Sequence, residues 1–433
     1  MYSLAIYIYM FCVNVVAIFN KKARLLMIGH SKTYRILREQ IDPKAQYIWF
    51  HAASLGEFEQ GRPLIERVRR EYPQYRILLT FFSPSGYEVR KNYEGADVVC
   101  YLPFDTALNA RKFLRLARPC MAFFIKYEFW QNYLNALCRA GIPAFSVSSI
   151  FRPDQIFFRS YGKRYARVLE CFTHFFVQNE ESRELLAQKG ITNVTIVGDT
   201  RFDRVLDISR QAADLPVVEQ FVAGTGRKVF IVGSSWEADE DVYLPYFKTT
   251  DHKLIIAPHV VSAERIAKLK ERLETMGKTV ALYTSAEQSN DTGALAGADV
   301  LLIDCYGKLS SIYRYASVAY VGGGFGVGIH NVPEAAVYGV PVVVGPNNRK
   351  FHEAQALLKA GGCFEINGSD EFNALMKRFD SEADFLSQAG EVAGRYISDN
   401  AGAADTVFKM VDFKDIPPYG EHWKHPDFTG MKH

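Results

Sequence analysis

The sequence has few features that would indicate a metal centre or a nucleic-acid partner. Its 433 residues include seven cysteines, but these form no CxxC pair and no His/Cys cluster at metal-ligand spacing. Scattered cysteines are typical of a reducing compartment. The formal net charge of +3 at pH 7 is too small to indicate nucleic-acid binding. We therefore expect no metal and no nucleic acid.

Two nucleotide-binding motifs are also missing. No G-x-G-x-x-G register fits the glycines between residues 322 and 328, and no G-x-x-x-x-G-K-[ST] loop occurs in the chain. Both absences argue against hydride transfer with NAD and against P-loop phosphoryl transfer. We expect no cofactor.

The N-terminus is almost uncharged and apolar from Met1 to Phe19, and the basic residues Lys21, Lys22 and Arg24 follow it. A signal peptide would have positive charge before the apolar run and a small-residue cleavage site after it, and both are missing. The pattern predicts an uncleaved membrane anchor over residues 1–22, with the rest of the chain on the cytoplasmic side of the membrane. There are two alternatives: a buried core helix, or a helix lying in the membrane interface. Asn14 and the many tyrosines would fit either of them.

The rest of the chain alternates apolar strand-like runs with amphipathic helical segments. Runs such as "YIWFHAAS", "CMAFFIKYE", "KVFIVGSS" and "VAYVGGGFG" are apolar on both faces, as buried parallel strands are. This predicts an α/β fold with two doubly wound, Rossmann-like domains facing a central cleft. We place the domains at residues 23–210 and 211–412, and an irregular tail at 413–433.

In the second domain, polar and small residues follow several predicted strands, where open α/β sheets bind ligands. The glycine-rich stretch before Asn331 predicts a loop that lets backbone approach a ligand, followed by a helix N-terminus that favours phosphate. Asn331 and Glu334 have spacing that an N-cap would also explain. Together these junctions predict one nucleotide pocket, formed by Gly233, Ser234, Pro258, His259, Gly307, Lys308, Leu309, Asn331, Val332, Pro333 and Glu334.

In the first domain, Glu57 follows the first strand in "HAASLGEFE". Its spacing from Ser54 is that of a capping box, so it has a structural explanation as well as a functional one. A carboxylate at a helix N-terminus is held ionised by the helix dipole and could accept a proton. Glu128, among aromatic residues after another strand, is a second candidate acid. In "VGDTRFDR", Arg201 is either part of a salt-bridged turn or a cation near developing negative charge.

Six motifs in order resemble those of the 3-deoxy-D-manno-octulosonic acid (Kdo) transferase family of lipopolysaccharide synthesis. They are "HAASLGEFE", "FFIKYEFWQN", "VGDTRFDR", "VGSSWEADE", "APHVVSAER" and "GIHNVPEAAVYGVPVVVGP". The resemblance implies a GT-B fold, the donor CMP-Kdo in the C-terminal domain and a lipid A precursor in the N-terminal domain. It also implies that Glu57 is the general base, that Glu128 and Arg201 stabilise the transition state, and that the second-domain residues named above contact CMP. The sequence departs from the family pattern at Arg201, at His259 and in "GIHNVPEA".

The resulting hypothesis is an inverting transfer of Kdo to a sugar hydroxyl that Glu57 deprotonates, with no metal. We expect the acceptor to contact Ser54, Gly56, Arg67, Arg69 and Arg70, although a run of arginines is often only a solvated helix face. A UDP-sugar glycosyltransferase or epimerase of the same fold is an alternative. A non-catalytic membrane-tethered scaffold is a third possibility.

Overall fold

The computed structural model describes residues 2–224, 226–289 and 292–420 of the chain. It divides into two compact units, which we describe separately. The first unit is Met1–Arg204 with Ala401–His433, and the second unit is Val205–Asn400. The division falls inside helix α9 (Thr200–Arg210), a few residues before the boundary that the sequence suggested.

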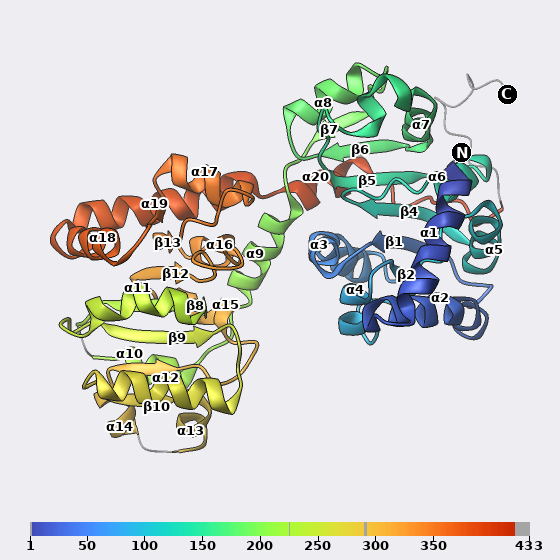
Figure 1. The fold of residues 1–433 in the computed structure, drawn as a ribbon. Helices are drawn as coiled ribbons and strands as arrows, with labels where there is room; N and C mark the ends of the chain where they lie inside the picture. Colours follow the sequence, from blue (N-terminus) through green and yellow to red (C-terminus); the bar gives the residue numbers. More distant parts are fainter. Residues whose placement is uncertain (1, 225, 290–291, 421–433) are drawn as a thin grey trace. The chain divides into compact units, whose positions relative to one another are not determined.

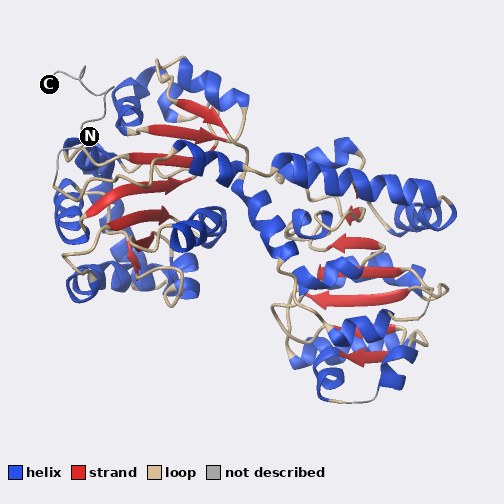
Figure 2. Cartoon of the chain, turned by 180° about the vertical axis from the view of Figure 1, so that it is seen from behind, coloured by secondary structure: helices blue, strands red, loops and turns tan. Residues whose placement is uncertain are grey.

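The first unit is built on a seven-stranded, wholly parallel sheet with helices on both faces (Figures 1 and 2). The strand order is β3-β2-β1-β4-β5-β6-β7. The strands are β1 (Tyr47–Ala52), β2 (Arg76–Phe81), β3 (Val98–Tyr101), β4 (Pro119–Ile125), β5 (Ala144–Ser149), β6 (His174–Val177) and β7 (Val194–Ile196). The helices are α1 (Tyr2–Ala17), α2 (Lys21–Gln40), α3 (Leu55–Glu71), α4 (Pro84–Arg90), α5 (Ala107–Ala117), α6 (Gln131–Arg139), α7 (Lys163–Ala166), α8 (Glu180–Ala187) and α20 (Ala403–Met410).

The sheet is buried on both faces because alternate residues of its central strands enter different apolar clusters. Trp49 and Phe124 pack with the helices on one face, while Phe50 and Phe123 pack on the other. This two-sided burial explains why the strands read as continuous apolar runs in the sequence.

The second unit repeats this architecture, with parallel strands in the order β10-β11-β9-β8-β12-β13-β14. Its strands are β8 (Val229–Ser235), β9 (Lys253–Pro258), β10 (Val280–Leu282), β11 (Val300–Leu302), β12 (Val318–Val321), β13 (Val342–Val344) and β14 (Cys363–Glu365). Its helices are α10 (Pro216–Val222), α11 (Glu237–Phe247), α12 (Ala263–Thr275), α13 (Tyr283–Gln288), α14 (Thr292–Gly297), α15 (Leu309–Ile312), α16 (Val332–Ala336), α17 (His352–Ala360), α18 (Ser369–Ser381) and α19 (Ala383–Asn400). The expected pair of doubly wound domains is therefore present.

The apolar N-terminus forms α1, a helix of 16 residues that contacts α2 (Figure 1). Ile6, Met10 and Val13 lie on one face of α1 and pack against a cluster around Phe104. The opposite face leaves Leu4, Ile8 and Phe11 exposed. Among the described residues, no helix is both long and apolar enough to cross a membrane. The expected spanning anchor is thus not seen.

The C-terminal segment packs on the first unit and not on the second, to which the sequence assigned residues 401–412. Helix α20 contacts α3, and Val407, Phe408 and Phe413 are buried in the cluster that contains Phe123. Phe413 and Ile416 are buried in the same cluster, so the start of the expected irregular tail belongs to the core. The spacing of apolar residues in α20 predicts a helix, but it does not show which of the two sheets the apolar face of that helix covers. Residues 421–433 of the expected tail lie outside the described residues.

Candidate active site and nucleotide-binding edge

Glu57 lies in the first turn of α3, directly after β1, and its carboxylate is anchored at one oxygen only. The backbone N–H of Ser54 donates to Glu57 Oε2 at 2.9 Å, and the Ser54 hydroxyl lies 3.3 Å from the same oxygen. Glu57 Oε1 has no hydrogen-bond partner among the described residues. The half-buried carboxylate can therefore cap the helix with one oxygen and accept a proton with the other.

The environment of Glu57 raises its pKa above the ordinary value for glutamate. Burial is the main cause, and the negative charge of Glu128 is the second; His51, the Ser54 amide and Lys126 oppose them. The sequence led us to expect that the helix dipole would favour the ionised form of this acid; burial and Glu128 act in the opposite direction, and the pKa is raised overall. A raised pKa makes Glu57 a stronger proton acceptor when it is ionised.

This raised pKa predicts a pH-dependent gain in stability for Glu57→Gln. Ionisation of Glu57 is disfavoured in the folded state, so it costs stability above the folded-state pKa and costs nothing below the ordinary pKa of glutamate. The variant should therefore have a higher free energy of unfolding than the wild type at neutral pH. The difference should vanish as the pH falls below 4, because both proteins are then neutral at residue 57. Urea denaturation at both pH values checks this; a gain that is equal at both would refute the charge argument.

Glu128 is only 7% exposed and receives two hydrogen bonds at the same oxygen. Trp130 Nε1–H donates to Glu128 Oε2 at 2.5 Å, and His51 Nε2 lies 3.1 Å from it. A buried carboxylate requires such donors, because it has lost its hydration. Lys126, two residues before Glu128, has a φ of 69°, in the left-handed region that non-glycine residues rarely adopt.

A chain of hydrogen bonds behind His51 allows its ring proton to lie on the nitrogen that faces Glu128. Trp49 Nε1–H donates to Thr80 Oγ1 at 2.8 Å, and Thr80 Oγ1 is 2.8 Å from His51 Nδ1. The Thr80 hydroxyl can then donate to Nδ1, and this geometry is better than its 3.4 Å approach to the Phe50 carbonyl. With Nδ1 accepting, the proton of a neutral ring sits on Nε2, which lies 3.1 Å from Glu128 Oε2. Trp130 Nε1 lies 3.0 Å from the same nitrogen, so in this tautomer the Trp130 N–H donates to Glu128 and not to His51. The relay from Trp49 through Thr80 and His51 thus supplies a donor to Glu128.

Arg201 lies at the start of α9 and is paired with Asp199. Arg201 Nη2 is 2.7 Å from Asp199 Oδ2, and Gln60 Nε2 donates to Asp199 Oδ1 at 2.8 Å. Burial acts to raise the pKa of Asp199, but the Arg201 charge and these hydrogen bonds lower it overall. Tyr127 is influenced by both Arg201 and Glu57. Burial raises the pKa of Tyr127 most, and Arg152 lowers it through its charge and a hydrogen bond. Smaller contributions to this pKa come from Glu57, which raises it, and Arg201, which lowers it.

The three arginines expected to bind the acceptor are paired within the first unit. Arg67 pairs with Glu71 and Asp405, Arg69 with Asp97 at 2.7 Å, and Arg70 with Glu71 at 3.1 Å. These pairs fit the reading of this run as an ordinary charged helix face. Their contact with the acceptor stays a prediction.

In the second unit, the expected nucleotide residues meet at the carboxyl edge of neighbouring strands. Gly233 and Ser234 lie just before the last residue of β8, and Pro258 ends β9. Gly307–Leu309 follow β11 and lead into α15, while Asn331 caps α16 and Val332–Glu334 form its first residues. A Cβ atom on Gly233 would lie 2.9 Å from Leu309 and 1.8 Å from the Tyr313 hydroxyl. Burial raises the pKa of Tyr313 most, and the negative charge of Glu334 raises it further.

The glycine-rich loop after β12 differs from the anion cradle that the sequence suggested. The N–H groups of Gly322, Gly323, Gly326 and Gly328 all donate within the protein, Gly323 to Asp239 Oδ2 at 2.8 Å. A Cβ atom on Gly324 would lie 2.5 Å from Gly345, so backbone packing explains that glycine.

Helix α16 is a single turn of five residues, and Pro333 removes one N–H from its start. The backbone amides of Asn331 and Val332 have no hydrogen-bond partner among the described residues. They are the donors that this segment offers to a ligand.

Sequence reasoning gave no role to Trp236 and His330, which the structure stacks on the two sides of His259, a predicted nucleotide contact. Trp236 and His259 stack with ring centroids 4.4 Å apart, and His259 and His330 at 4.5 Å. Burial, and secondly the neighbouring His259, lower the pKa of His330. His51 and Trp130 in the first unit were also missed. The four residues that were missed all lie within the quoted motifs, which was the available signal. Among the described residues, no three His, Cys, Asp or Glu side chains are grouped so that they could hold a metal ion.

Comparisons with known proteins agree with the six motifs. Residues 28–204 match the family described as 3-Deoxy-D-manno-octulosonic-acid transferase (kdotransferase). A 3-deoxy-D-manno-octulosonic acid transferase of Rickettsia felis is 24% identical over 372 residues, which cover 84% of this chain and 78% of that protein.

Two solved structures share the arrangement of two parallel-sheet units. The UDP-GlcNAc 2-epimerase from Neisseria meningitidis, bound to UDP-GlcNAc, has a TM-score of 0.58 at 14% identity and covers 84% of this chain and 99% of its own. Acinetobacter baumannii MurG has a TM-score of 0.51 at 12% identity and covers 84% of this chain and 100% of its own. At these identities the likeness shows the fold alone, which is of GT-B type. The family match and the curated relative confirm the resemblance carried by the motifs, and the chain is related to the 3-deoxy-D-manno-octulosonic acid transferases.

Proposed function

We propose that this protein is an inverting glycosyltransferase that moves Kdo from CMP-Kdo to a lipid A precursor, lipid IVA, in lipopolysaccharide synthesis. The observation that carries the proposal is the acid pair of the first unit. Glu57 has one anchored and one available oxygen, and its pKa is raised by burial and by the charge of Glu128. The relationship to the Kdo transferases supports the choice of sugar.

In the proposed reaction, Glu57 Oε1 accepts the proton of an acceptor hydroxyl, whose oxygen attacks the anomeric carbon of Kdo as CMP departs. An ionised Glu128 disfavours negative charge on Glu57, so it favours the protonated Glu57 that proton transfer produces. Arg201 places positive charge near Tyr127 at the same edge of the sheet. In the second unit, the amides of Asn331 and Val332 would receive the departing phosphate.

The location that we propose is the cytoplasmic face of the inner membrane. Helix α1 packs on the protein through one face and exposes Leu4, Ile8 and Phe11 on the other. A helix with an apolar exposed face can lie in the membrane interface, and Lys21 and Lys22, which are exposed at the start of α2, would meet anionic lipid.

A nucleotide screen tests the donor class. Calorimetric titration of the purified protein should show binding of CMP in preference to UDP. Preference for UDP would favour the UDP-sugar transferase or epimerase alternative, which the fold alone allows, and absence of any nucleotide binding would favour the scaffold.

The hydrogen-bond relay behind Glu128 makes a prediction of its own. Thr80→Val removes the hydroxyl that donates to His51 Nδ1, so His51 can place its proton on either nitrogen and no longer reliably donates to Glu128. We expect kcat to fall about thirtyfold with little change in KM, because a hydrogen bond to a charged group is worth on the order of 2 kcal/mol. Thr80→Ser keeps the hydroxyl and should retain activity. Equal losses in both variants would mean that Thr80 matters only for packing.

A further inference from the structure

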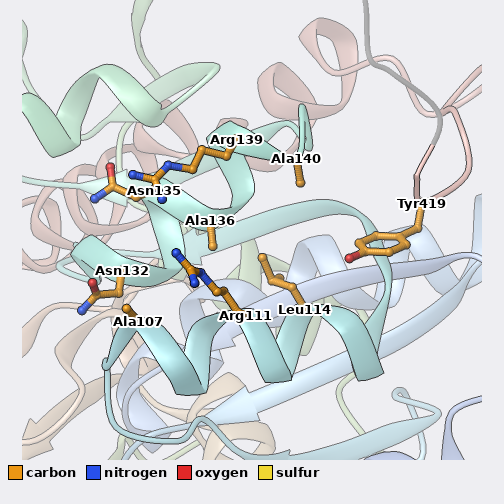
Figure 3. A pocket seen from close by; sticks show the side chains of 9 residues that line it. All are labelled: Ala107, Arg111, Leu114, Asn132, Asn135, Ala136, Arg139, Ala140 and Tyr419. Atoms are coloured by element: carbon orange, nitrogen blue, oxygen red, sulfur yellow. The ribbon is translucent and has the colours of Figure 1, made fainter. Parts of the chain in front are cut away.

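A polar cavity lies between α5 and α6 of the first unit, apart from the acid pair. Its volume is about 470 Å³, within the range of small-molecule sites. Leu114 and Ala136 supply apolar surface, while Arg111, Asn132, Asn135 and Arg139 supply polar groups (Figure 3).

The two helices that form this cavity carry positive charge without any acid. Neither α5 nor α6 contains Asp or Glu, and Glu128 is the only acidic residue between Asp105 and Asp154. Glu128 is buried against His51 and Trp130. Among the described residues, Arg111 and Arg139 have no ion-pair partner, in contrast to the arginines of α3.

The polar groups are arranged so that they can act on one ligand. In Figure 3 the Arg111 side chain extends from α5 toward α6, where Asn135 and Arg139 lie one helical turn apart. The Cys171 thiol donates to Asn135 Oδ1 at 3.5 Å, which leaves Asn135 Nδ2 as a donor. Two guanidinium groups and an amide N–H₂ form a donor set suited to a phosphate group, which guanidinium binds in a bidentate manner.

We propose that this cavity binds the phosphate of an anionic lipid head group. The inference rests on the membrane-surface location in the proposed function. Asn132, which lines the cavity, approaches Ser3 of α1 at 3.5 Å between Nδ2 and Oγ, and Tyr2 donates to Asp105 at 2.6 Å next to the start of α6. One end of the cavity therefore adjoins the first turn of α1, whose exposed Leu4 and Ile8 would contact the acyl chains.

Vesicle flotation with the full-length protein tests this site. The vesicles contain phosphatidylcholine alone or phosphatidylcholine with phosphatidylglycerol, and the variant is Arg111→Gln with Arg139→Gln. The matched control is Lys112→Gln with Arg115→Gln, which removes the same charge from α5 outside the cavity. A third variant, Arg111→Lys with Arg139→Lys, keeps the charge and removes the guanidinium geometry.

We expect the cavity variant to lose about tenfold more binding to phosphatidylglycerol vesicles than the control, and the lysine variant to lose severalfold. Equal losses in the cavity variant and the control would show diffuse attraction and overturn the proposal. The proposal would also be overturned if the wild type bound inorganic phosphate, the cavity variant did not, and the two proteins bound the vesicles equally well. The assay measures no sugar transfer, so its failure and the failure of the transferase proposal are separate results.

Discussion

Replacing Glu57 by glutamine is expected to lower kcat for Kdo transfer by about 10²-fold to 10⁴-fold, the usual contribution of a general base. Glutamine can still accept the Ser54 N–H through its side-chain oxygen, so the start of α3 should be preserved. What it cannot do is take a proton from the acceptor. Steady-state kinetics with CMP-Kdo and lipid IVA measure the effect.

Two comparisons make the Glu57 result specific. CMP affinity should be unchanged in Glu57→Gln, because the proposed nucleotide contacts lie in the second unit. Glu59→Gln, two residues further along α3, removes a carboxylate that pairs with Arg62 and Arg90, and it should leave kcat within a few-fold of the wild type. Near-normal turnover by Glu57→Gln would remove this residue from the mechanism.

Replacing Glu128 by glutamine should lower kcat by about 10²-fold to 10³-fold, as loss of an electrostatic contribution to a transition state does. It should also move the acidic limb of the kcat/KM profile to lower pH. The reason is that the charge of Glu128 is one of the causes that raise the Glu57 pKa, so its removal lets Glu57 lose its proton at a lower pH.

The shift can be measured without substrate. In protein labelled with ¹³C at the glutamate carboxyl, the Glu57 signal is assigned by its loss in Glu57→Gln, and its titration midpoint is compared with and without Glu128. A midpoint that is unmoved, or that rises, in Glu128→Gln would contradict the electrostatic coupling of the two acids.

The fold was largely predictable because its signals are local in the sequence. Runs such as "YIWFHA" are apolar on both faces only if helices cover both sides of the sheet, and Trp49 and Phe50 do enter different clusters. The assignment of α20 was not predictable, since its apolar face fits either unit and only tertiary packing places it against α3.

The sequence predicted that the candidate site residues lie at the ends of strands, but it did not predict how their side chains interact. The sequence places Glu57 and Glu128 after strands, and β1 and β4 are neighbours in the sheet. It does not show that Glu128 raises the Glu57 pKa, because that depends on burial and separation in space. Nor does it show that Trp49, Thr80 and His51 form a relay, since each reads as an ordinary strand residue. The ligand role of the glycines after β12 stays a prediction, because in a sequence a glycine needed for backbone packing looks the same as one that admits a ligand.

The most direct test of the central claim is the mass and anomeric configuration of the product. The purified protein is incubated with CMP-Kdo and lipid IVA, and the lipid is then analysed by mass spectrometry and NMR. The account predicts a lipid heavier by one or more Kdo residues, with the configuration at the anomeric carbon inverted relative to CMP-Kdo, and none of this product with Glu57→Gln. The account would be contradicted if the lipid stayed unmodified while the same wild-type protein acted on a UDP-sugar. A product with retained anomeric configuration would also contradict it.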